Sequence, residues 1–564
     1  MDIIKVILVL IPLFVIYGLG TEYRKRKWKN ARLYRIRADW DEMKDDTDLS
    51  YISEVKKMYR QNKGVSPGEV DDITWNDLNL DEIYHLMNDT HSTMGELYLY
   101  HILRNPEDNL QILQERDRVS RYFANNQEVR INKEYQLSDI GKYNRVSIYK
   151  YKEEIQKFPK LHVLPHIIMG GLQLSTLILC LYRLNFGILL FLILLLVNLT
   201  YYYHTKKKLE LHLPVVTQLG SMLNTIKKMD DLSHYEELKP YARILNNATK
   251  LSNTYRKYYR CMGNITLGVI PDIDAFYSSF IVTYLHLDII LFPLLNQLIR
   301  KNFDRIIQIY ETVGFLDCMI SIASFRHKMS ALEGNVLCSP IFIDNVSYEG
   351  EDIYHPLLGR ESVTNNITTS HSVLITGSNA TGKSTFLRTI GINTILAQSI
   401  YTVFGTSYKA PFFHILSSMN LRDNVQNNDS YYMAEVKALK RIMDAIHEDK
   451  PILCCIDEVL RGTNTTERIA ASSIILEKIS ESNTLCFVAS HDLELTYILE
   501  KYYDNYHFQE EVGEAGIICD YILYKGRSYT RNAIHILKFI GFSNEIIEEA
   551  RQRADSYMNH GKWL

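Results

Sequence analysis

The sequence lacks the cysteine and charge patterns of several common protein classes. Its 8 cysteines are scattered over 564 residues, with no C-x-x-C pair and no histidine at metal-ligand spacing. This pattern argues against a disulfide framework or a structural metal, and it fits a reducing compartment. A net charge of −3, from 63 basic and 66 acidic side chains, shows no overall basic excess. That is mild evidence against a constitutive DNA-binding protein, although a net charge near zero still allows a local basic patch. Internal repeats and low-complexity stretches are also absent.

The most informative segment is residues 373–385. Apolar residues 373–376 predict a buried strand, and residues 386–397 have helical composition. Between them lies the phosphate-loop pattern G-x-x-x-x-G-K-[ST], filled by Gly377, Gly382, Lys383 and Ser384. The glycines let backbone N–H groups turn toward phosphate oxygens, Lys383 can reach the β- and γ-phosphates, and Ser384 can ligate Mg²⁺. The segment therefore predicts an ATP site. The alternative, a glycine turn that matches by chance, does not explain the flanking strand and helix.

Acidic residues end a second apolar run, residues 451–456. A buried parallel strand would deliver Asp457 and Glu458 to the carboxyl edge of a sheet. We expect Asp457 to hold Mg²⁺, directly or through water, and Glu458 to orient or deprotonate the attacking water. A third predicted strand, residues 484–490, is followed by His491, a candidate to contact the γ-phosphate. The alternatives are acids that simply end a strand and a histidine that caps or fills the core.

These motifs resemble those of the MutS mismatch-repair ATPases. The phosphate loop has Asn379 at its third place, and the acid pair is followed by an Arg-Gly-Thr-x-Thr-like loop at residues 461–465. Residues 489–496 and 429–435 are also similar to motifs of that family. The resemblance implies catalytic roles for Lys383, Glu458 and His491. It implies nucleotide binding by Gly377, Ser378, Asn379, Ala380, Thr381, Gly382, Lys383, Ser384 and Thr385, with Mg²⁺ on Ser384 and Asp457.

The same resemblance implies a dimer. In the family, the element that matches residues 429–435 is offered across a dimer to the nucleotide of the partner. Ser430 would therefore act in trans on the γ-phosphate, supported by Tyr431 and Tyr432. The segment from Tyr529 onward resembles the C-terminal dimerisation element of the family. The expected protein is a homodimeric ATPase that uses ATP and Mg²⁺.

The resemblance is fainter upstream of the phosphate loop. Residues 88–95, followed by apolar positions at helical spacing, resemble the start of the MutS core domain. An Arg-Asn-Pro break at residues 104–106 predicts two helices that meet there. Any helical bundle could produce this pattern. Residues 354–358 resemble the segment that opens the ATPase domain.

Three long apolar runs depart from the family: residues 3–19, 163–182 and 186–203. Lengths of about eighteen to twenty residues match the ~30 Å hydrocarbon layer. The third run is too uniformly apolar to be one face of a soluble helix, and residues 183–185 would form the turn of a helical hairpin. The first run could instead be a signal peptide, and the other two could be a buried pair in a large soluble core.

Basic residues give these runs one orientation. Residues 24–29 follow the first run, four lysines lie at residues 150–160, and Lys206, Lys207 and Lys208 follow the third run. The positive-inside rule places them in the cytoplasm. We therefore expect a multi-pass membrane protein with three spans, its N-terminus outside and its ATPase domain in the cytoplasm.

The organisation leaves two functions open. No room precedes the core-like segment for a mismatch-reading domain, and the hairpin takes the place of the DNA-gripping clamp. By resemblance the chain is a tethered, DNA-associated ATPase that binds duplex, mismatched or structured DNA. The alternative is an ATP-driven membrane switch that does not bind DNA. A transporter subunit of the ABC type would need an L-S-G-G-Q-like signature, which residues 429–435 do not match.

The predicted fold class is an α/β phosphate-loop domain with a mainly parallel sheet, plus an all-α core and lever region with transmembrane helices. In the lever region we expect long helices over residues 209–229, 238–259, 274–300 and 303–330. The predicted parts are a membrane helix (1–20), a basic juxtamembrane segment (21–70), a core-like helical region (71–162), the membrane hairpin (163–204), the lever region (205–335), the ATPase domain (336–530) and the dimerisation element (531–564).

Overall fold

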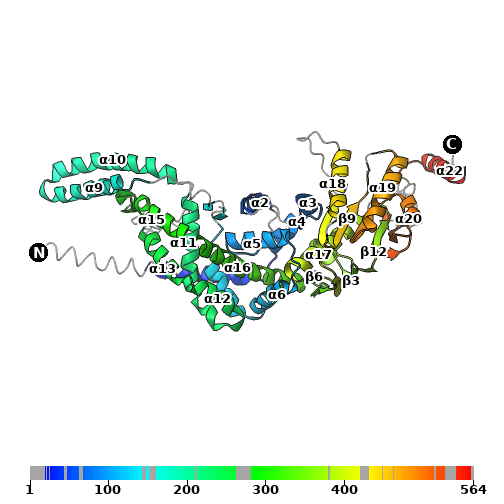
Figure 1. Ribbon diagram of the computed structural model, residues 1–564, viewed down its shortest axis with the longest axis horizontal. Coiled ribbons are helices and arrows are strands. Elements are labelled where there is room, and N and C mark those ends of the chain that lie inside the picture. Colours follow the sequence, from blue (N-terminus) through cyan, green and yellow to red (C-terminus); the bar gives the residue numbers. More distant parts are fainter. Residues whose placement is uncertain are drawn as a thin grey trace. The chain divides into compact units, whose positions relative to one another are not determined.

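The computed structural model describes most of the chain and divides it into two compact units (Figure 1). The first comprises Met1–Val65, Met87–His101 and Arg118–Lys328, and the second Ser66–Leu86, Ile102–Asp117 and Met329–Leu564. The described residues are 20, 22–24, 26–43, 48–62, 68–142, 148–149, 151–152, 161–209, 212–261, 281–378, 381–419, 431–447, 449–461, 463–513, 516–527 and 541–560.

The second unit is built on a mainly parallel 6-stranded sheet, as predicted. Its strand order is β12-β11-β5-β10-β9-β8, and only the β11–β12 pair is antiparallel. Every residue of β5, β9 and β10 is buried, because parallel strands are covered by helices on both faces. The strands are β5 (Ser372–Thr376), β8 (His414–Ser418), β9 (Ile452–Asp457), β10 (Thr484–Ala489), β11 (Tyr503–Gly513) and β12 (Gly516–Lys525).

Helices and two smaller sheets complete this unit. A 4-stranded sheet has the order β2-β7-β3-β4, and β1 pairs with β6. The helices are α17 (Lys383–Ile400), α18 (Tyr431–Ala445), α19 (Thr465–Ser480), α20 (Leu493–Ile498) and α22 (Asn544–His560). The short strands are β1 (Leu337–Cys338), β2 (Ile341–Phe342), β3 (Tyr348–Ile353), β4 (Asn365–Thr369), β6 (Val403–Phe404) and β7 (Ser407–Ala410), and a 3₁₀ helix, η3, spans Pro356–Glu361.

An upstream segment belongs to this unit. Helices α3 (Asp72–Asp77) and α4 (Leu80–Met87) precede the predicted ATPase domain (336–530) by about 250 residues, and α3 packs on edge strand β8. The Asp77 carboxylate accepts hydrogen bonds from Ser417 Oγ at 2.6 Å and from Met419 N–H at 2.9 Å. These bonds hold α3 at the end of β8.

The first unit is helical. The predicted break near residue 105 is confirmed, because one helix ends at Arg104 and the next begins at Leu110; the break itself lies within Ile102–Asp117, which belongs to the second unit. The predicted single helix over residues 238–259 is wrong: the chain turns at Asn247, and the Ala248 N–H bonds to Leu245 O instead of continuing a helical ladder. The helices are α2 (Ser50–Asn62), α5 (Thr93–Arg104), α6 (Leu110–Asn125), α7 (Gln127–Leu137), α9 (Leu164–Tyr182), α10 (Leu184–Leu209), α11 (Leu213–Lys228), α12 (Lys239–Asn246), α13 (Thr249–Cys261), α15 (Leu287–Lys301) and α16 (Phe303–Ala331), with 3₁₀ helices η1 (Asp230–His234) and η2 (Glu236–Leu238).

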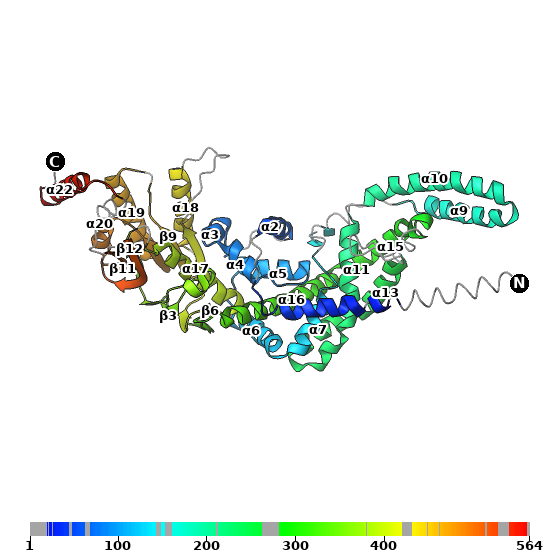
Figure 2. The ribbon, with the colours of Figure 1, turned by 180° about the vertical axis from the view of Figure 1, so that it is seen from behind.

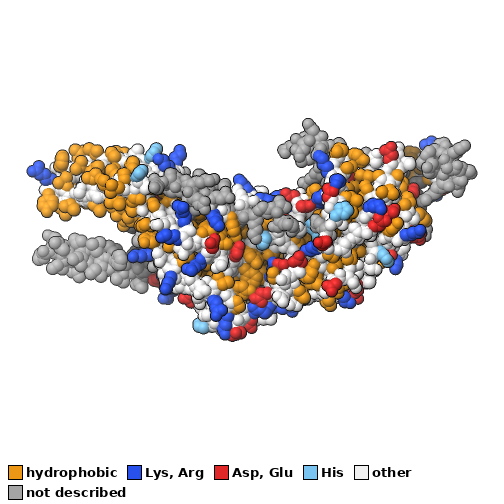
Figure 3. Space-filling view, viewed as in Figure 1, with side chains coloured by type: hydrophobic (Ala, Val, Ile, Leu, Met, Phe, Trp, Pro, Cys, Tyr) orange, Lys and Arg blue, Asp and Glu red, His pale blue; other side chains and the backbone are white. Residues whose placement is uncertain are grey.

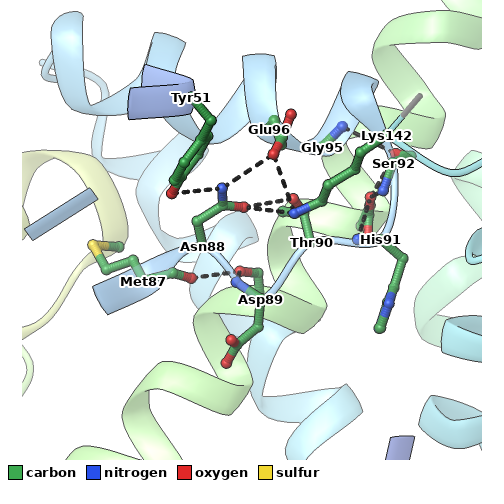
Figure 4. A network of polar contacts seen from close by, with 12 residues as sticks. Tyr51, Met87, Asn88, Asp89, Thr90, His91, Ser92, Gly95, Glu96 and Lys142 are labelled. Atoms are coloured by element: carbon green, nitrogen blue, oxygen red, sulfur yellow. Dashed lines mark hydrogen bonds and ion pairs between the residues drawn. The ribbon is translucent and has the colours of Figure 1, made fainter. Parts of the chain in front are cut away.

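A buried polar network ties the segment before α5 to α16 (Figure 4). Ser92 Oγ accepts from Gly95 N–H at 3.1 Å, which caps the first turn of α5. The Asp317 carboxylate of α16 accepts from Ser92 Oγ at 2.5 Å and from the N–H groups of His91 and Ser92. Burial raises the pKa of Asp317 to about 6, although these donors and Lys142 oppose the shift. A Cβ on Gly95 would lie 2.3 Å from Asp317 Oδ2, so the packing requires glycine there.

The two hairpin helices are long, apolar and exposed. Helices α9 and α10 match the predicted runs at 163–182 and 186–203, and only 22% and 11% of their most apolar windows are buried. Figure 3 shows hydrophobic side chains gathered over both helices. The alternative of a buried pair in a soluble core is therefore wrong. Gly187 allows the tight turn, because a Cβ there would lie 2.7 Å from Cys180 Cα.

Among the described residues, one more helix is long and apolar enough to span a membrane, and we did not predict it as a span. Helix α16 is long and apolar, but 83% of its most apolar stretch is buried, so it is a core helix of the first unit. The predicted span at residues 3–19 lies outside the described residues. A membrane is not part of the structure, so the predicted orientation stays a prediction.

Candidate functional site

The ends of three parallel strands form the site. Ile375 of β5 pairs with Ala489 of β10, which pairs with Asp457 of β9. This register brings the phosphate loop, the acid pair and the segment of His491 to one edge of the sheet. Ser490 N–H donates to Ile375 O at 3.0 Å and Glu458 N–H to Ala489 O at 2.9 Å, which continues the pairing beyond the strands.

The phosphate loop between β5 and α17 depends on two glycines. Gly377 has a φ of +145° and Gly382 a φ of +96°. A Cβ on Gly377 would meet Phe508 O of β11 at 3.1 Å. Thr381 Oγ1 donates to Ser378 O at 2.9 Å and closes the loop on itself. The loop leads directly into the N-terminus of α17, where free N–H groups and the helix dipole favour a bound anion.

Lys383 lies buried behind the loop. Its Nζ donates to Gly377 O at 2.8 Å and to Ser378 O at 2.5 Å, and only 3% of the residue is exposed. Burial lowers the pKa of Lys383 to about 8, although the charges of Asp457 and Glu458 act in the opposite direction. A nearby phosphate would favour the protonated ammonium.

Ser384 and Asp457 form a pair of oxygen ligands. Ser384 Oγ donates to Asp457 Oδ2 at 2.5 Å, and Asp457 is buried. A hydroxyl and a carboxylate are hard oxygen donors, which Mg²⁺ prefers. This donor set therefore fits Mg²⁺. Among the described residues, the structure has no cluster of three or more His, Cys, Asp or Glu side chains that could hold a metal by themselves. Phosphate and water oxygens would have to complete the shell.

Both carboxylate oxygens of Glu458 are engaged. His491 Nε2 lies 2.9 Å from Oε1, and Arg461 Nε contacts Oε2. The backbone of Glu458 is left-handed, with a φ of +58°, a strained conformation for a non-glycine residue. Burial raises the pKa of Glu458, but the His491 hydrogen bond and the charges of Arg461 and Lys383 outweigh it, and the net pKa is lowered. Glu458 is therefore ionised at neutral pH, as a base must be.

Sequence reasoning missed the roles of three residues around these groups. Arg461 pairs with Glu458, and its N–H donates to Glu435 Oε1 at 3.2 Å. Ser378 Oγ donates to Glu510 of β11, which is buried. Arg461 and Glu435 lie within the sequence motifs at residues 461–465 and 429–435, so the sequence could have indicated that both are near the site. Glu510 has no sequence signal, because only the pairing of β11 with β5 brings it to the loop.

The remaining predicted residues divide into two groups. Thr385 is half-buried in the first turn of α17, and Thr381 is fully buried within the loop. Asn379, Ala380 and Ser430 lie outside the described residues. Tyr431, the residue after Ser430, is the first residue of α18.

Comparison with known proteins gives matches to the region that carries this site. Residues 373–558 match the family model for MutS domain V. A DNA mismatch repair protein MutS of Thermus thermophilus is 27% identical over 201 residues, which cover 35% of this chain and 24% of that protein. The protein of the same name from Aquifex pyrophilus is 33% identical over 183 residues, covering 32% of this chain and 21% of the relative. For Staphylococcus carnosus the identity is 24% over 284 residues, or 48% of this chain and 32% of the relative. The matched part spans about a third or less of each curated relative.

Proposed function

Because its phosphate-loop domain makes this chain a MutS-family protein, we propose that it is a membrane-anchored ATPase that works as a homodimer. The observation that supports hydrolysis is the meeting of Lys383, the Ser384–Asp457 pair and Glu458 at one sheet edge. Each of these groups has a distinct part in phosphoryl transfer to water.

Lys383 and the loop would bind the phosphates. The Lys383 ammonium donates to two carbonyl oxygens of its own loop, and phosphate oxygens are stronger acceptors for the same protons. ATP would therefore draw Lys383 from these carbonyls to the β- and γ-phosphates. Ser384 and Asp457 would hold Mg²⁺, which neutralises developing charge on the phosphates when bound.

Glu458 would act on the attacking water. Its ionised carboxylate is held by His491 and Arg461, which fix its orientation and keep its pKa low. To accept a proton from water, one oxygen must exchange a present partner for that water. His491, whose side chain is 36% exposed, is the partner that we propose moves to the γ-phosphate.

A composite site across the dimer can be tested by mixing subunits. Lys383→Ala removes the phosphate contact in its own subunit, and Ser430→Ala removes the proposed contact given to the partner. Mixed dimers would contain one site with neither defect and should regain hydrolysis. Mixtures that stay as inactive as both parents, in dimers whose mixed composition is confirmed by mass, would refute action in trans.

The exposed hairpin supports the membrane anchor. Two neighbouring helices of 19 and 26 residues, whose most apolar stretches are only 22% and 11% buried, would expose too large an apolar surface for a soluble protein. Residues 163–204 would therefore cross the bilayer, and the run at residues 1–20 is proposed as a further span. With the basic segments inside, the ATPase domain would face the cytoplasm.

The output of hydrolysis has two candidates. The relatives are named DNA mismatch repair proteins, which favours an association with duplex, mismatched or structured DNA. The exposed hairpin favours a membrane switch driven by nucleotide. We would measure ATP hydrolysis of the full chain in nanodiscs with duplex, mismatched and branched DNA across a salt series. Stimulation that falls with salt would support DNA, and hydrolysis indifferent to all three DNAs would leave the switch.

A further inference from the structure

The hairpin helices bury polar faces and expose apolar ones. Residues three or four apart share one face of a helix, so each buried set forms a stripe. In α9 this stripe consists of His166, Gly170, Gln173 and Thr176. In α10 the buried residues are Gly187, Asn198, Tyr202, Thr205 and Leu209. A soluble helical pair shows the reverse arrangement. Polar faces turned inward are typical of helices whose surroundings are hydrocarbon.

The stripe contacts residues 281–288 of the same unit. Asn198 Nδ2 donates to Tyr284 O at 3.0 Å, and Tyr284 Oη donates to Gln173 O at 3.4 Å. His166 Nδ1 and His286 Nδ1 lie 2.7 Å apart, so one ring donates to the other. Helix α15 packs on α9, and Figures 1 and 2 show the two side by side from both directions.

The prediction of a single helix over residues 274–300 is wrong, because this segment is a broken helix. Residues 281–285 are helical, His286 is left-handed with a φ of +55°, and α15 begins at Leu287. Such a break removes backbone hydrogen bonds of the helix, and the Asn198 side chain donates a hydrogen bond to the Tyr284 carbonyl instead. The backbone also approaches closely, because a Cβ on Gly170 would lie 3.4 Å from Leu285 O. Non-helical backbone is tolerated at membrane depth only where protein satisfies it in this way.

The contacts also give the depth of the segment along the hairpin. Gln173 follows Leu164, the first residue of α9, by nine residues, and a rise of 1.5 Å per residue places it about 14 Å along the helix. Asn198 precedes Lys206 of α10 by eight residues, or about 12 Å. Both helices therefore place Tyr284 nearly halfway into a hydrocarbon layer of ~30 Å.

A charged group marks the end of the hairpin at which α15 leaves it. Tyr202 Oη donates to Asp288 Oδ2 at 2.7 Å, and Lys206 Nζ donates to Tyr202 Oη at 2.6 Å. Lys206 is also 3.4 Å from Asp288 Oδ2 and keeps 27% of its side chain exposed. Charged residues near a membrane boundary are usually paired, and a lysine there extends its ammonium group toward the interface. Lys206 and Asp288 fit this pattern.

We propose that residues 281–288 form a further membrane-embedded element, a discontinuous helix docked on the polar stripe of the hairpin with its outer side against lipid acyl chains. The inference rests on the membrane anchoring proposed above. Ile281, which is 52% exposed, is the side chain that lipid would cover. The element continues through α15 to α16, so the hairpin holds the start of this helical path.

Lipid labelling of the full chain tests the proposal. The protein is held in nanodiscs of phosphatidylcholine with an acyl-chain diazirine, and carbene adducts are located by mass spectrometry. We expect adducts on the hairpin and on residues 281–287, but none on α16, an apolar helix of similar length that is buried. Adducts on the hairpin alone would refute the embedded segment and leave the anchor standing. A hairpin free of adducts would refute the anchor and this inference with it.

A matched pair of variants tests the docking. Asn198→Leu keeps the size of the side chain and removes the donor to Tyr284 O, so we expect amide exchange over residues 281–290 to rise about fivefold in nanodiscs. Thr200→Val is the control, because Thr200 is exposed and its Oγ1 bonds to Leu196 O within the same helix. Equal exchange in both variants, with the Asn198→Leu protein inserted and monodisperse, would show that the stripe does not hold the segment.

Discussion

Replacing Glu458 by glutamine separates hydrolysis from folding and binding. Glutamine keeps the size of the side chain, and its one amide oxygen can still accept a hydrogen bond from Arg461, while its NH₂ group faces His491. It cannot take a proton from water. A positioned base contributes about 10²–10⁴-fold to a rate. We expect hydrolysis at least tenfold slower, and about a hundredfold slower if Glu458 is the sole base, which equals ~2.7 kcal/mol of barrier.

Stability and affinity should change little in this variant. Arg461 is 38% exposed, so solvent screens its pairing with Glu458, and loss of that charge should cost about 1 kcal/mol or less. Loss of the Glu458 charge lowers the pKa of Lys383 further, which weakens phosphate binding, but it also removes a negative charge beside the phosphates. Because these effects oppose each other, we expect nucleotide affinity to change by less than about threefold.

The assay combines steady-state phosphate release at saturating ATP with binding of a fluorescent ATP analogue and thermal unfolding. Measurement near pH 6.5 keeps Lys383 mostly protonated in both proteins, since its pKa is about 8. Normal hydrolysis by a folded Glu458→Gln protein would refute the role of Glu458 and require another group to orient the water. Equal loss of hydrolysis and binding would show instead that Glu458 supports the phosphate site.

Three further predictions follow from other contacts. Lys383→Ala should abolish nucleotide binding or hydrolysis, because no other ammonium reaches the loop among the hydrogen bonds of the described residues; unchanged turnover would refute the site. Ser378→Ala and Glu510→Ala should each raise the KM for ATP several-fold with kcat nearly unchanged. The double variant should be no worse than the singles, since both changes remove the same hydrogen bond; additive losses would contradict this. The pKa of Asp317 is about 6 in the folded protein and 3.8 in the unfolded chain, so protonation of Asp317 stabilises the fold fully below pH 3.8. This contribution of about 3 kcal/mol is lost as the pH rises through 6. The free energy of urea unfolding of Asp317→Asn should lack this decrease with pH, and an unchanged decrease would assign it to another group.

Local patterns were sufficient to find the phosphate loop and its strands. Residues 373–375, 452–456 and 485–489 are continuous apolar runs because both faces of a parallel strand are buried, and the glycines of the loop are required by backbone conformation. Chemistry that depends on consecutive residues can be read along the chain in this way. The order of residues was therefore enough to predict that the acid pair and Lys383 lie at one edge of the sheet.

Contacts between distant segments could not be read in this way. Glu510 reaches Ser378 only because β11 pairs with β5, and Asp77 holds the end of β8 from over 300 residues upstream. No local periodicity records such partners. The helix predicted over residues 238–259 failed for a related reason, since a turn at Asn247 that contains neither Gly nor Pro carries little sequence signal.

Apolar helices show most clearly the difference between composition and packing. Composition is enough to establish that α9, α10 and α16 are long and apolar enough to cross a membrane. Packing alone reveals that α16 is covered by its own unit while the hairpin exposes its apolar side chains, and that the hairpin buries a polar stripe against a helix broken at His286. The physical reason is that composition sets the free energy available from burial, whereas the packing partners determine whether protein or lipid provides it.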